Sequence, residues 1–319
     1  MHQVLEKFQK IGLIPVVKID RAEDAVPLAK ALCDGGLPVA EVTFRTAAAK
    51  DAIAAMSKAY PDMLVGAGTV LTVQQVDDAV AAGAQFIVSP GLNPKVVRHC
   101  QEIGVPITPG VTSPTEIEQA LELGLQVLKF FPAEASGGLA KIKAMSAPYG
   151  SVMFMPTGGI HAGNLNSYLE FPKILACGGS WMVSGELINR GEFAQITALT
   201  KEAIREMLGF KIKHVGINPC DADALTTANL FEDTFGFTKY ETPISYFCDS
   251  SIEIMKEPGE GKKGHIAIQT NYMDRAVYYL EQRGYCFRQD TAMLDEKGKL
   301  KLIYLEGEYD GFAVHLCKK

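Results

Sequence analysis

The strongest constraint on the fold is one alternation, repeated along the chain up to about residue 207. A short apolar run, rich in β-branched residues, is followed each time by an amphipathic segment rich in Ala, Glu and Gln. Strands that are apolar throughout are typical of a parallel sheet covered by helices. Strands are predicted at residues 13–17, 39–44, 64–66, 86–88, 106–108, 127–131, 152–155 and 174–176. Helices are predicted at residues 22–33, 47–60, 73–82, 94–102, 114–123, 139–146, 163–168 and 186–208.

Eight strand–helix units are the number that closes a (β/α)8 TIM barrel. An open, doubly wound sheet is the alternative, although such sheets usually contain fewer strands. We therefore predict an α/β fold with a TIM-barrel domain at residues 1–207. In such a barrel the functional side chains lie at the carboxyl ends of the strands, so polar residues at those ends are the candidates for a site.

Beyond residue 208 charged residues become denser, and two similar blocks follow one another. Each block has a first strand that carries a histidine, then a helix that ends in a Gly-aromatic step, then further strands. The first block has these strands and helix at 213–217, 222–231 and 251–255, and the second at 264–268, 273–283 and 312–316. The duplication predicts an α+β domain of two β-α-β-β-β modules at residues 213–319, after a linker at 208–212.

The composition, 47% hydrophobic and 21% charged, is that of a folded soluble protein and excludes a disordered or collagen-like chain. A net charge of −6 argues against nucleic acid as a partner. No apolar stretch approaches the roughly 20 residues of a membrane span, and charges interrupt the N-terminal segment, so we expect neither membrane association nor a secretory signal. The seven cysteines lack C-x-x-C spacing, which favours a reducing, cytoplasmic location.

Lys129 lies inside the apolar run at 127–131, where an ammonium group is costly. One interpretation is a lysine that extends to the barrel rim. The other is a nucleophile, because an amine deprived of water favours the neutral form that attacks a ketone. The protonated imine that results draws electrons from the adjacent carbon, so that a C–C bond two atoms away breaks and leaves an enamine.

This chemistry needs a group that moves protons, and Glu41 is the only carboxylate within an apolar strand of the predicted barrel. Glu41 also shares a strand face with Arg45, so a salt bridge between these two residues is a second interpretation. The guanidinium of Arg45, together with Thr69 at the end of the next strand, suits the carboxylate of a substrate.

Glycine pairs follow the seventh and eighth predicted strands, as Gly158-Gly159 and as Gly178-Gly179 with Ser180 after it. Barrels commonly bind phosphate at these two strand ends through backbone N–H groups. A carboxylate site, an amine for a ketone and a phosphate site together predict a phosphorylated 2-keto acid as the substrate.

Six motifs are in register with one known family along residues 5–207. They are Glu41-Val-Thr-Phe-Arg45-Thr, Gly66-Ala-Gly-Thr69-Val, Ser89-Pro-Gly91, Lys129-Phe-Phe-Pro-Ala-Glu134, Pro156-Thr-Gly-Gly-Ile160 and Gly178-Gly-Ser-Trp181. With these motifs the chain resembles the 2-keto-3-deoxy-6-phosphogluconate (KDPG) aldolase / 4-hydroxy-2-oxoglutarate (KHG) aldolase family.

The resemblance implies a homotrimeric class I aldolase that needs no metal. It implies that Lys129 forms the Schiff base and that Glu41 is the general acid and base. It places the carboxylate contacts on Arg45 and Thr69, and the phosphate contacts on Thr157, Gly158, Gly159 and Ser180. Lys18, at the end of the first strand, adds positive charge where many relatives carry arginine, and a simple rim lysine is the other interpretation.

The expected reaction is cleavage of KDPG to pyruvate and glyceraldehyde 3-phosphate, with cleavage of KHG to pyruvate and glyoxylate as a second activity. An epimerase or isomerase barrel for phosphosugars is an alternative that shares the phosphate turns but has no use for Lys129. A non-catalytic sugar-phosphate sensor is another.

The duplicated module resembles the vicinal oxygen chelate, or glyoxalase-like, fold. In that fold a metal is held by residues of the first and last strands of each module. By position these residues are His214, Glu253, His265 and His315, with His315 where the family usually has glutamate. Such a set suits divalent Zn, Ni, Fe or Mn. The domain is then either a metal-dependent enzyme acting on a related keto acid or aldehyde, or a module for ligand binding or oligomerisation.

Overall fold

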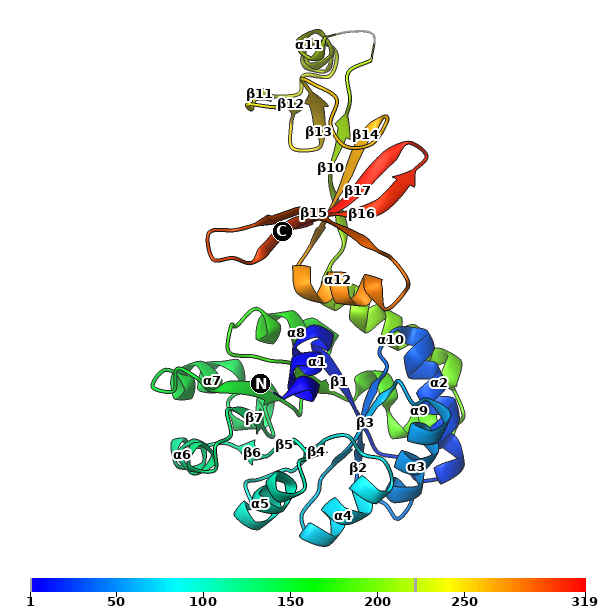
Figure 1. Ribbon diagram of the computed structural model, residues 1–319, viewed down its shortest axis with the longest axis vertical. Helices are drawn as coiled ribbons and strands as arrows, with labels where there is room; N and C mark the ends of the chain where they lie inside the picture. The colour runs from blue at the N-terminus through cyan, green and yellow to red at the C-terminus, as the bar shows by residue number, and fades with distance from the viewer. Residues whose placement is uncertain (1, 221–222) are drawn as a thin grey trace. The chain divides into compact units, whose positions relative to one another are not determined.

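The computed structural model describes residues 2–220 and 223–319. The chain forms two compact units, Met1–Met207 and Leu208–Lys319, each with its own sheets (Figure 1). Within the described residues, no helix has both the length and the apolar character needed to cross a bilayer.

The strands of the first unit form a closed ring. A parallel sheet of order β5-β4-β3-β2-β1-β9 is continued by a parallel sheet of order β6-β7-β8, because β5 and β6 are two parts of one strand separated by Pro109. Bridges Phe154–Ile174 and Thr157–Gly178 close the ring between β8 and β9. The predicted TIM barrel is therefore confirmed. Its strands are β1 (Leu13–Val17), β2 (Val39–Thr43), β3 (Leu64–Gly68), β4 (Ile87–Val88), β5 (Ile107–Thr108), β6 (Gly110–Val111), β7 (Val127–Phe130), β8 (Met153–Pro156) and β9 (Cys177–Gly179).

Helices surround this ring, and their starts follow from local capping. In α6 the Ser113 side chain accepts from the Glu116 N–H while the Glu116 carboxylate accepts from the Ser113 N–H, as the spacing predicts. The helices are α1 (Gln3–Ile11), α2 (Ala25–Gly35), α3 (Ala49–Ala59), α4 (Val73–Ala81), α5 (Pro94–Glu102), α6 (Pro114–Glu122), α7 (Gly138–Ser146), α8 (Ala162–Leu169), α9 (Gly185–Asn189) and α10 (Phe193–Leu208), with short 3-10 turns η1 (Ala22–Asp24), η2 (Glu134–Ser136) and η3 (Trp181–Val183).

Several elements of the barrel differ from the prediction. The single helix predicted at 186–208 is two helices, α9 and α10, because Gly191 adopts the left-handed φ of 71° and ends the first. The last strand is β9 rather than residues 174–176, of which Ile174 makes only an isolated bridge. Helix α1 was not predicted, yet it buries Phe8 and Ile11.

The second unit is one eight-stranded sheet of order β11-β12-β13-β10-β14-β17-β16-β15. Each half has the predicted β-α-β-β-β order, and the first strands of the two halves, β10 and β14, pair antiparallel in the middle. The predicted helix at 222–231 begins at Ala224; its expected first residue, 222, lies outside the described residues. The elements are β10 (Lys211–Ile217), α11 (Ala224–Phe235), β11 (Lys239–Glu241), β12 (Ser245–Cys248), β13 (Ile252–Met255), β14 (Gly264–Thr270), α12 (Met273–Glu281), β15 (Phe287–Leu294), β16 (Leu300–Tyr309) and β17 (Phe312–Lys318).

Candidate active site

Lys129 and Glu41 form a buried pair inside the barrel. Lys129 lies on β7 and is 5% exposed, and Glu41 lies on β2 and is 2% exposed. The Lys129 ammonium donates to Glu41 Oε1 at 3.0 Å. The lysine therefore does not reach the rim. Among the described residues Glu41 makes its ion pair with Lys129, and the alternative pair with Arg45 is absent.

Two further residues, Phe131 and Gly68, contact this pair and were not predicted to do so. The Phe131 ring lies under the Lys129 ammonium, with its centroid 5.2 Å from Nζ. Gly68, at the end of β3, leaves the space that the Glu41 side chain fills, because a Cβ at this position would lie 2.3 Å from Glu41 Oε1. A glycine at the end of an apolar strand was the only signal for this contact.

Arg45 and Thr69 meet at the carboxyl ends of the neighbouring strands β2 and β3. The Arg45 Nε donates to Thr69 Oγ1 at 3.4 Å. Thr69 adopts a φ of 56°, a left-handed conformation that costs a branched residue energy and that often occurs at functional sites. Thr43, on the same strand face as Glu41, donates instead to the Val17 carbonyl and has a structural role.

The two glycine turns lie side by side at the ends of β8 and β9, where Thr157 and Gly178 pair in a bridge. A Cβ at Gly178 would lie 2.4 Å from Thr157 Oγ1, so glycine permits this approach. Gly158 and Gly159 have φ values of 98° and 79°. The bridge engages the Gly158 N–H, whereas among the described residues no protein acceptor is found for the N–H groups of Gly159 and Ser180. Such free donors suit an anion.

Lys18 follows β1 and is half exposed. Its ammonium contacts Asp20 Oδ1 at 2.6 Å, so its charge is partly neutralised on the protein surface. No contact between described residues joins Lys18 to the Lys129–Glu41 pair. A role for Lys18 in substrate binding stays a prediction.

The four candidate metal ligands of the second unit come together on its four central strands, β13, β10, β14 and β17. The Nε2 atoms of His214 and His265 lie 3.1 Å apart, and each lies 3.2 Å from Glu253 Oε2. One ligating nitrogen of His315 lies within 4.8 Å of those of the other two histidines. All four side chains are largely buried.

Several neighbours hold this histidine–glutamate cluster in place. The Ser245 hydroxyl donates to Glu253 Oε1 at 2.6 Å. Burial raises the pKa of Glu253, but hydrogen bonds with His214, His265 and Ser245 outweigh it and hold the pKa well below its usual range. A Cβ at Gly216 would lie 2.1 Å from the His265 ring, so glycine is required beside it. Desolvation by burial lowers the pKa of His315 to about 4, which keeps this imidazole neutral, as a metal ligand must be.

The distances in this cluster fit a bound ion. Ligands that each lie about 2.1 Å from a metal are separated by roughly 3.0 Å on an octahedral edge and roughly 3.4 Å on a tetrahedral edge. The three separations of 3.1–3.2 Å among His214, His265 and Glu253 lie between these values. The donor set of imidazoles and one carboxylate is also the set that divalent transition metals prefer.

The barrel part of the chain is similar to known proteins. The sequence profile described as "KDPG and KHG aldolase" matches residues 4–199. A 2-dehydro-3-deoxy-phosphogluconate aldolase of Treponema pallidum is 55% identical over 205 residues, which are 64% of this chain and 98% of the relative. A protein of the same name from Haemophilus influenzae is 50% identical over 203 residues, 64% of this chain and 96% of the relative.

A solved structure is similar over the same share of the chain. A KDPG aldolase from Legionella pneumophila, with pyruvate captured as a covalent carbinolamine, is 42% identical with a TM-score of 0.61, and the match covers 63% of this chain and 98% of that one. The profile match ends inside α10, so residues 200–319 lie beyond it.

Proposed function

The chain belongs to the KDPG and KHG aldolase family, and we propose that its barrel cleaves KDPG to pyruvate and glyceraldehyde 3-phosphate through an imine on Lys129. Cleavage of KHG to pyruvate and glyoxylate follows the same steps. The observation that carries the proposal is the buried contact of 3.0 Å between the Lys129 ammonium and Glu41. A nucleophile and a proton-transfer group are thereby in direct contact, away from water.

In the proposed reaction, the Lys129 ammonium first passes a proton to Glu41 along their hydrogen bond. The neutral amine adds to the C2 ketone, and the resulting hydroxyl takes the proton from Glu41 and leaves as water, giving a protonated imine. The Glu41 carboxylate then removes the proton of the C4 hydroxyl. The C3–C4 electron pair moves toward the imine nitrogen, and the aldehyde is released. Protonated Glu41 returns its proton to C3, and water hydrolyses the pyruvate imine.

The carboxylate and the phosphate of the substrate bind to separate groups of residues. The substrate carboxylate binds the Arg45 guanidinium with Thr69, whose side chains already contact each other. The phosphate accepts hydrogen bonds from the free N–H groups of Gly159 and Ser180, and it lies against Gly158 and Thr157. Lys18 at the barrel surface adds positive charge for the same anionic substrate.

Borohydride trapping tests this proposal. We expect one reduced pyruvate adduct per chain, located on Lys129 by peptide mass spectrometry, because borohydride reduces an imine to a stable secondary amine. Lys143, an exposed lysine of α7, provides the matched control, and Lys143→Met should label like the unmodified protein. An epimerase or a sugar-phosphate sensor would leave Lys129 unlabelled, and that result would reject the aldolase mechanism.

We also propose that the protein works as a cytoplasmic homotrimer without nucleic-acid or membrane partners. The net charge of −6 is unfavourable for binding polyanionic nucleic acid. The seven cysteines include five that are buried or half-buried as free thiols, which suits a reducing compartment. The aldolase chemistry itself uses only protein groups and requires no metal.

For the second unit we propose a divalent metal, Zn, Ni, Fe or Mn, held by His214, Glu253 and His265 with His315, in a vicinal-oxygen-chelate-like domain. The support is the set of ligand separations and the buried carboxylate in this cluster. A bound ion would supply Lewis-acid polarisation of a ligand oxygen. Ser245 would orient the Glu253 carboxylate, since such outer contacts fix the ligands of a metal. A keto acid or aldehyde would suit that chemistry, and a purely structural or ligand-binding module is the second candidate.

Metal analysis of the full chain tests this assignment. After chelator treatment and reloading, we expect one divalent ion per chain by mass spectrometry. His265→Ala should abolish stoichiometric loading, and Ser245→Ala should weaken the affinity about 10- to 100-fold, as for other outer contacts. His99→Ala, which removes a histidine paired with Asp77 in the barrel, is the control and should load normally. Failure of all four metals to load would show that the cluster is a hydrogen-bonded core.

A further inference from the structure

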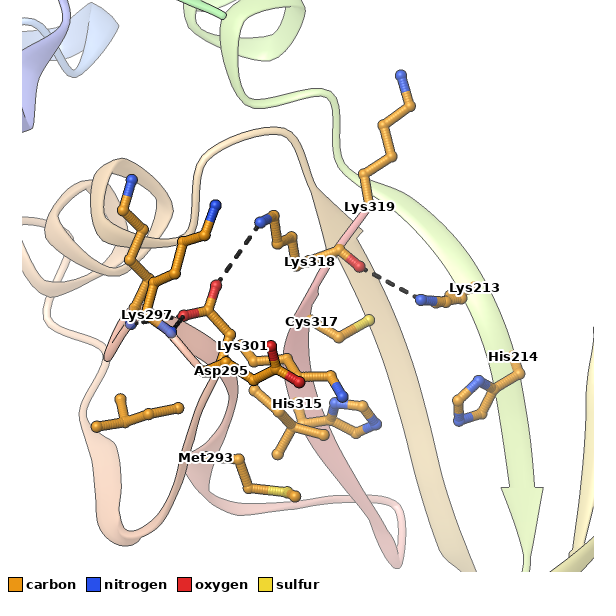
Figure 2. A pocket seen from close by; sticks show the side chains of 14 residues that line it. Lys213, His214, Met293, Asp295, Lys297, Lys301, His315, Cys317, Lys318 and Lys319 are labelled. Atoms are coloured by element: carbon orange, nitrogen blue, oxygen red, sulfur yellow. Dashed lines mark hydrogen bonds and ion pairs between the residues drawn. The ribbon is translucent and has the colours of Figure 1, made fainter. Parts of the chain in front are cut away.

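A second concave site lies in the C-terminal unit, next to the histidine–glutamate cluster but extending away from it. It is a pocket of about 800 Å³, bounded by β10, β17 and the β15–β16 hairpin (Figure 2). This volume is within the range of sites that hold a small metabolite, about 300–1,000 Å³. His214 and His315 line one part of it.

The pocket is strongly basic in an acidic protein. Six lysines line it against two acidic residues, so its formal charge is +4, whereas the whole chain carries −6. A concentration of one charge in a hollow surface focuses the field and attracts ligands of the opposite charge. The lysines are Lys213, Lys297, Lys299, Lys301, Lys318 and Lys319.

Most of this charge is not neutralised by the protein. Among the described residues, the ammonium groups of Lys297, Lys299 and Lys301 have no ion-pair partner. The carboxylates that line the pocket are those of Glu296 and Asp295. The Oδ1 atom of Asp295 accepts the backbone N–H groups of Lys297 and Lys299, both at 2.9 Å. Its Oδ2 atom lies 3.9 Å from the Lys318 ammonium. This ion pair is drawn as a dashed line in Figure 2. Asp295 therefore shapes the hairpin turn that presents the lysines and leaves their charges available.

The floor of the pocket is lined by apolar side chains and imidazoles rather than by lysines. Strand pairing of Leu302 with Cys317 and of Met293 with Leu302 places these three side chains on one face of the sheet. His315 lies on the same face, two residues from Cys317 along β17. The floor thus offers apolar contact and imidazoles, while the lysines supply positive charge. This combination fits a compact organic anion better than a free inorganic ion.

We propose that this pocket binds a small organic polyanion, a compound whose two or more negative charges are carried by phosphate or carboxylate groups. The carbon skeleton packs on Met293 and Leu302, and the anionic groups contact Lys297, Lys299 and Lys301, which reach the pocket from its border because Lys301 alternates with Leu302 along β16. The site is separate from the barrel and does not require the metal, although a ligand seated there lies beside His214 and His315. The second unit is thereby a binding module for charged metabolites.

Calorimetric titration of the full chain in the presence of chelator tests the proposal. The probes are glycerol 2-phosphate for phosphate chemistry and citrate for carboxylate chemistry, with glucose as the neutral control. We expect at least one of the two anions to bind, with an affinity that falls as salt is raised, and glucose not to bind. Lys299→Ala/Lys301→Ala should weaken this binding about tenfold or more, because each lost charge-assisted hydrogen bond is a substantial part of the affinity.

Two further variants separate the pocket from other anion sites. Lys262→Ala/Lys263→Ala removes two exposed lysines of the same unit outside the pocket and should bind as the unmodified protein does. Lys299→Arg/Lys301→Arg keeps the charge and should retain binding. Aldolase turnover should be the same in all three variants, since none of these residues belongs to the barrel. Binding of neither anion, or binding that persists unchanged in the double alanine variant, would overturn the proposal.

Discussion

Lys129→Ala is expected to lose KDPG cleavage by at least about 10⁴-fold in kcat, because no other group in the barrel replaces the amine that forms the imine. The measurement is pyruvate release under saturating KDPG, coupled to NADH oxidation by lactate dehydrogenase. Retention of a substantial fraction of the turnover would exclude an imine on Lys129. Borohydride labelling by pyruvate should disappear together with the activity.

The loss must be distinguished from unfolding. Removing one partner of a buried ion pair leaves an uncompensated charge and costs up to about 3–5 kcal/mol, less if Glu41 takes up a proton. The double variant Lys129→Met/Glu41→Gln removes both charges at similar volume. Its free energy of unfolding should therefore be closer to that of the unmodified protein. It should be as inactive as Lys129→Ala. A double variant that is stable and inactive assigns the loss to chemistry rather than to stability.

Glu41→Gln is expected to lower kcat about 10²- to 10⁴-fold, because the amide keeps the shape of the carboxylate but cannot transfer a proton. Imine formation also slows, since it loses the same proton transfers, but water replaces them slowly and the imine still accumulates over a long incubation. Pyruvate should still be trapped on Lys129 by borohydride. Exchange of the pyruvate methyl protons for deuterium, followed by NMR, should slow in parallel with kcat.

Glu118→Gln is the matched control, since Glu118 is an exposed glutamate that accepts from the Tyr149 hydroxyl in the same barrel. This variant should exchange the methyl protons of pyruvate and cleave KDPG at the rates of the unmodified protein. If Glu41→Gln exchanged methyl protons as fast as this control, the proton-transfer role would belong to another group.

Much of the barrel could be predicted because its determinants are local. Apolar runs, Pro94 and Pro114 at the starts of α5 and α6, and the Ser113–Glu116 cap are all visible within a few residues. The broken helix was missed because Gly191 lies in a segment whose apolar spacing continues on both sides. Helix α1 was missed although Val4, Phe8 and Ile11 recur at helical spacing, because it precedes the first strand and lies outside the strand–helix alternation.

The candidate site residues could likewise be predicted only in part from the sequence. Lys129 and Glu41 stand out in sequence because charges are rare in apolar strands, but their contact joins residues 88 positions apart and depends on closure of the ring. The lysine-lined pocket could not be predicted from the sequence, since lysines are common on exposed hairpins and do not by themselves indicate a binding site. Only the pairing of β15, β16 and β17 brings them around one pocket.

The division of the histidine–glutamate cluster between two repeats has a thermodynamic consequence. His214 and Glu253 come from the first β-α-β-β-β copy, and His265 and His315 come from the second. Neither copy holds the full donor set, so an ion that binds there couples the unfolding of one repeat to the unfolding of the other. Its occupancy would be linked to cooperative unfolding of the entire unit, and the melting temperature of that unit would rise with free ion concentration.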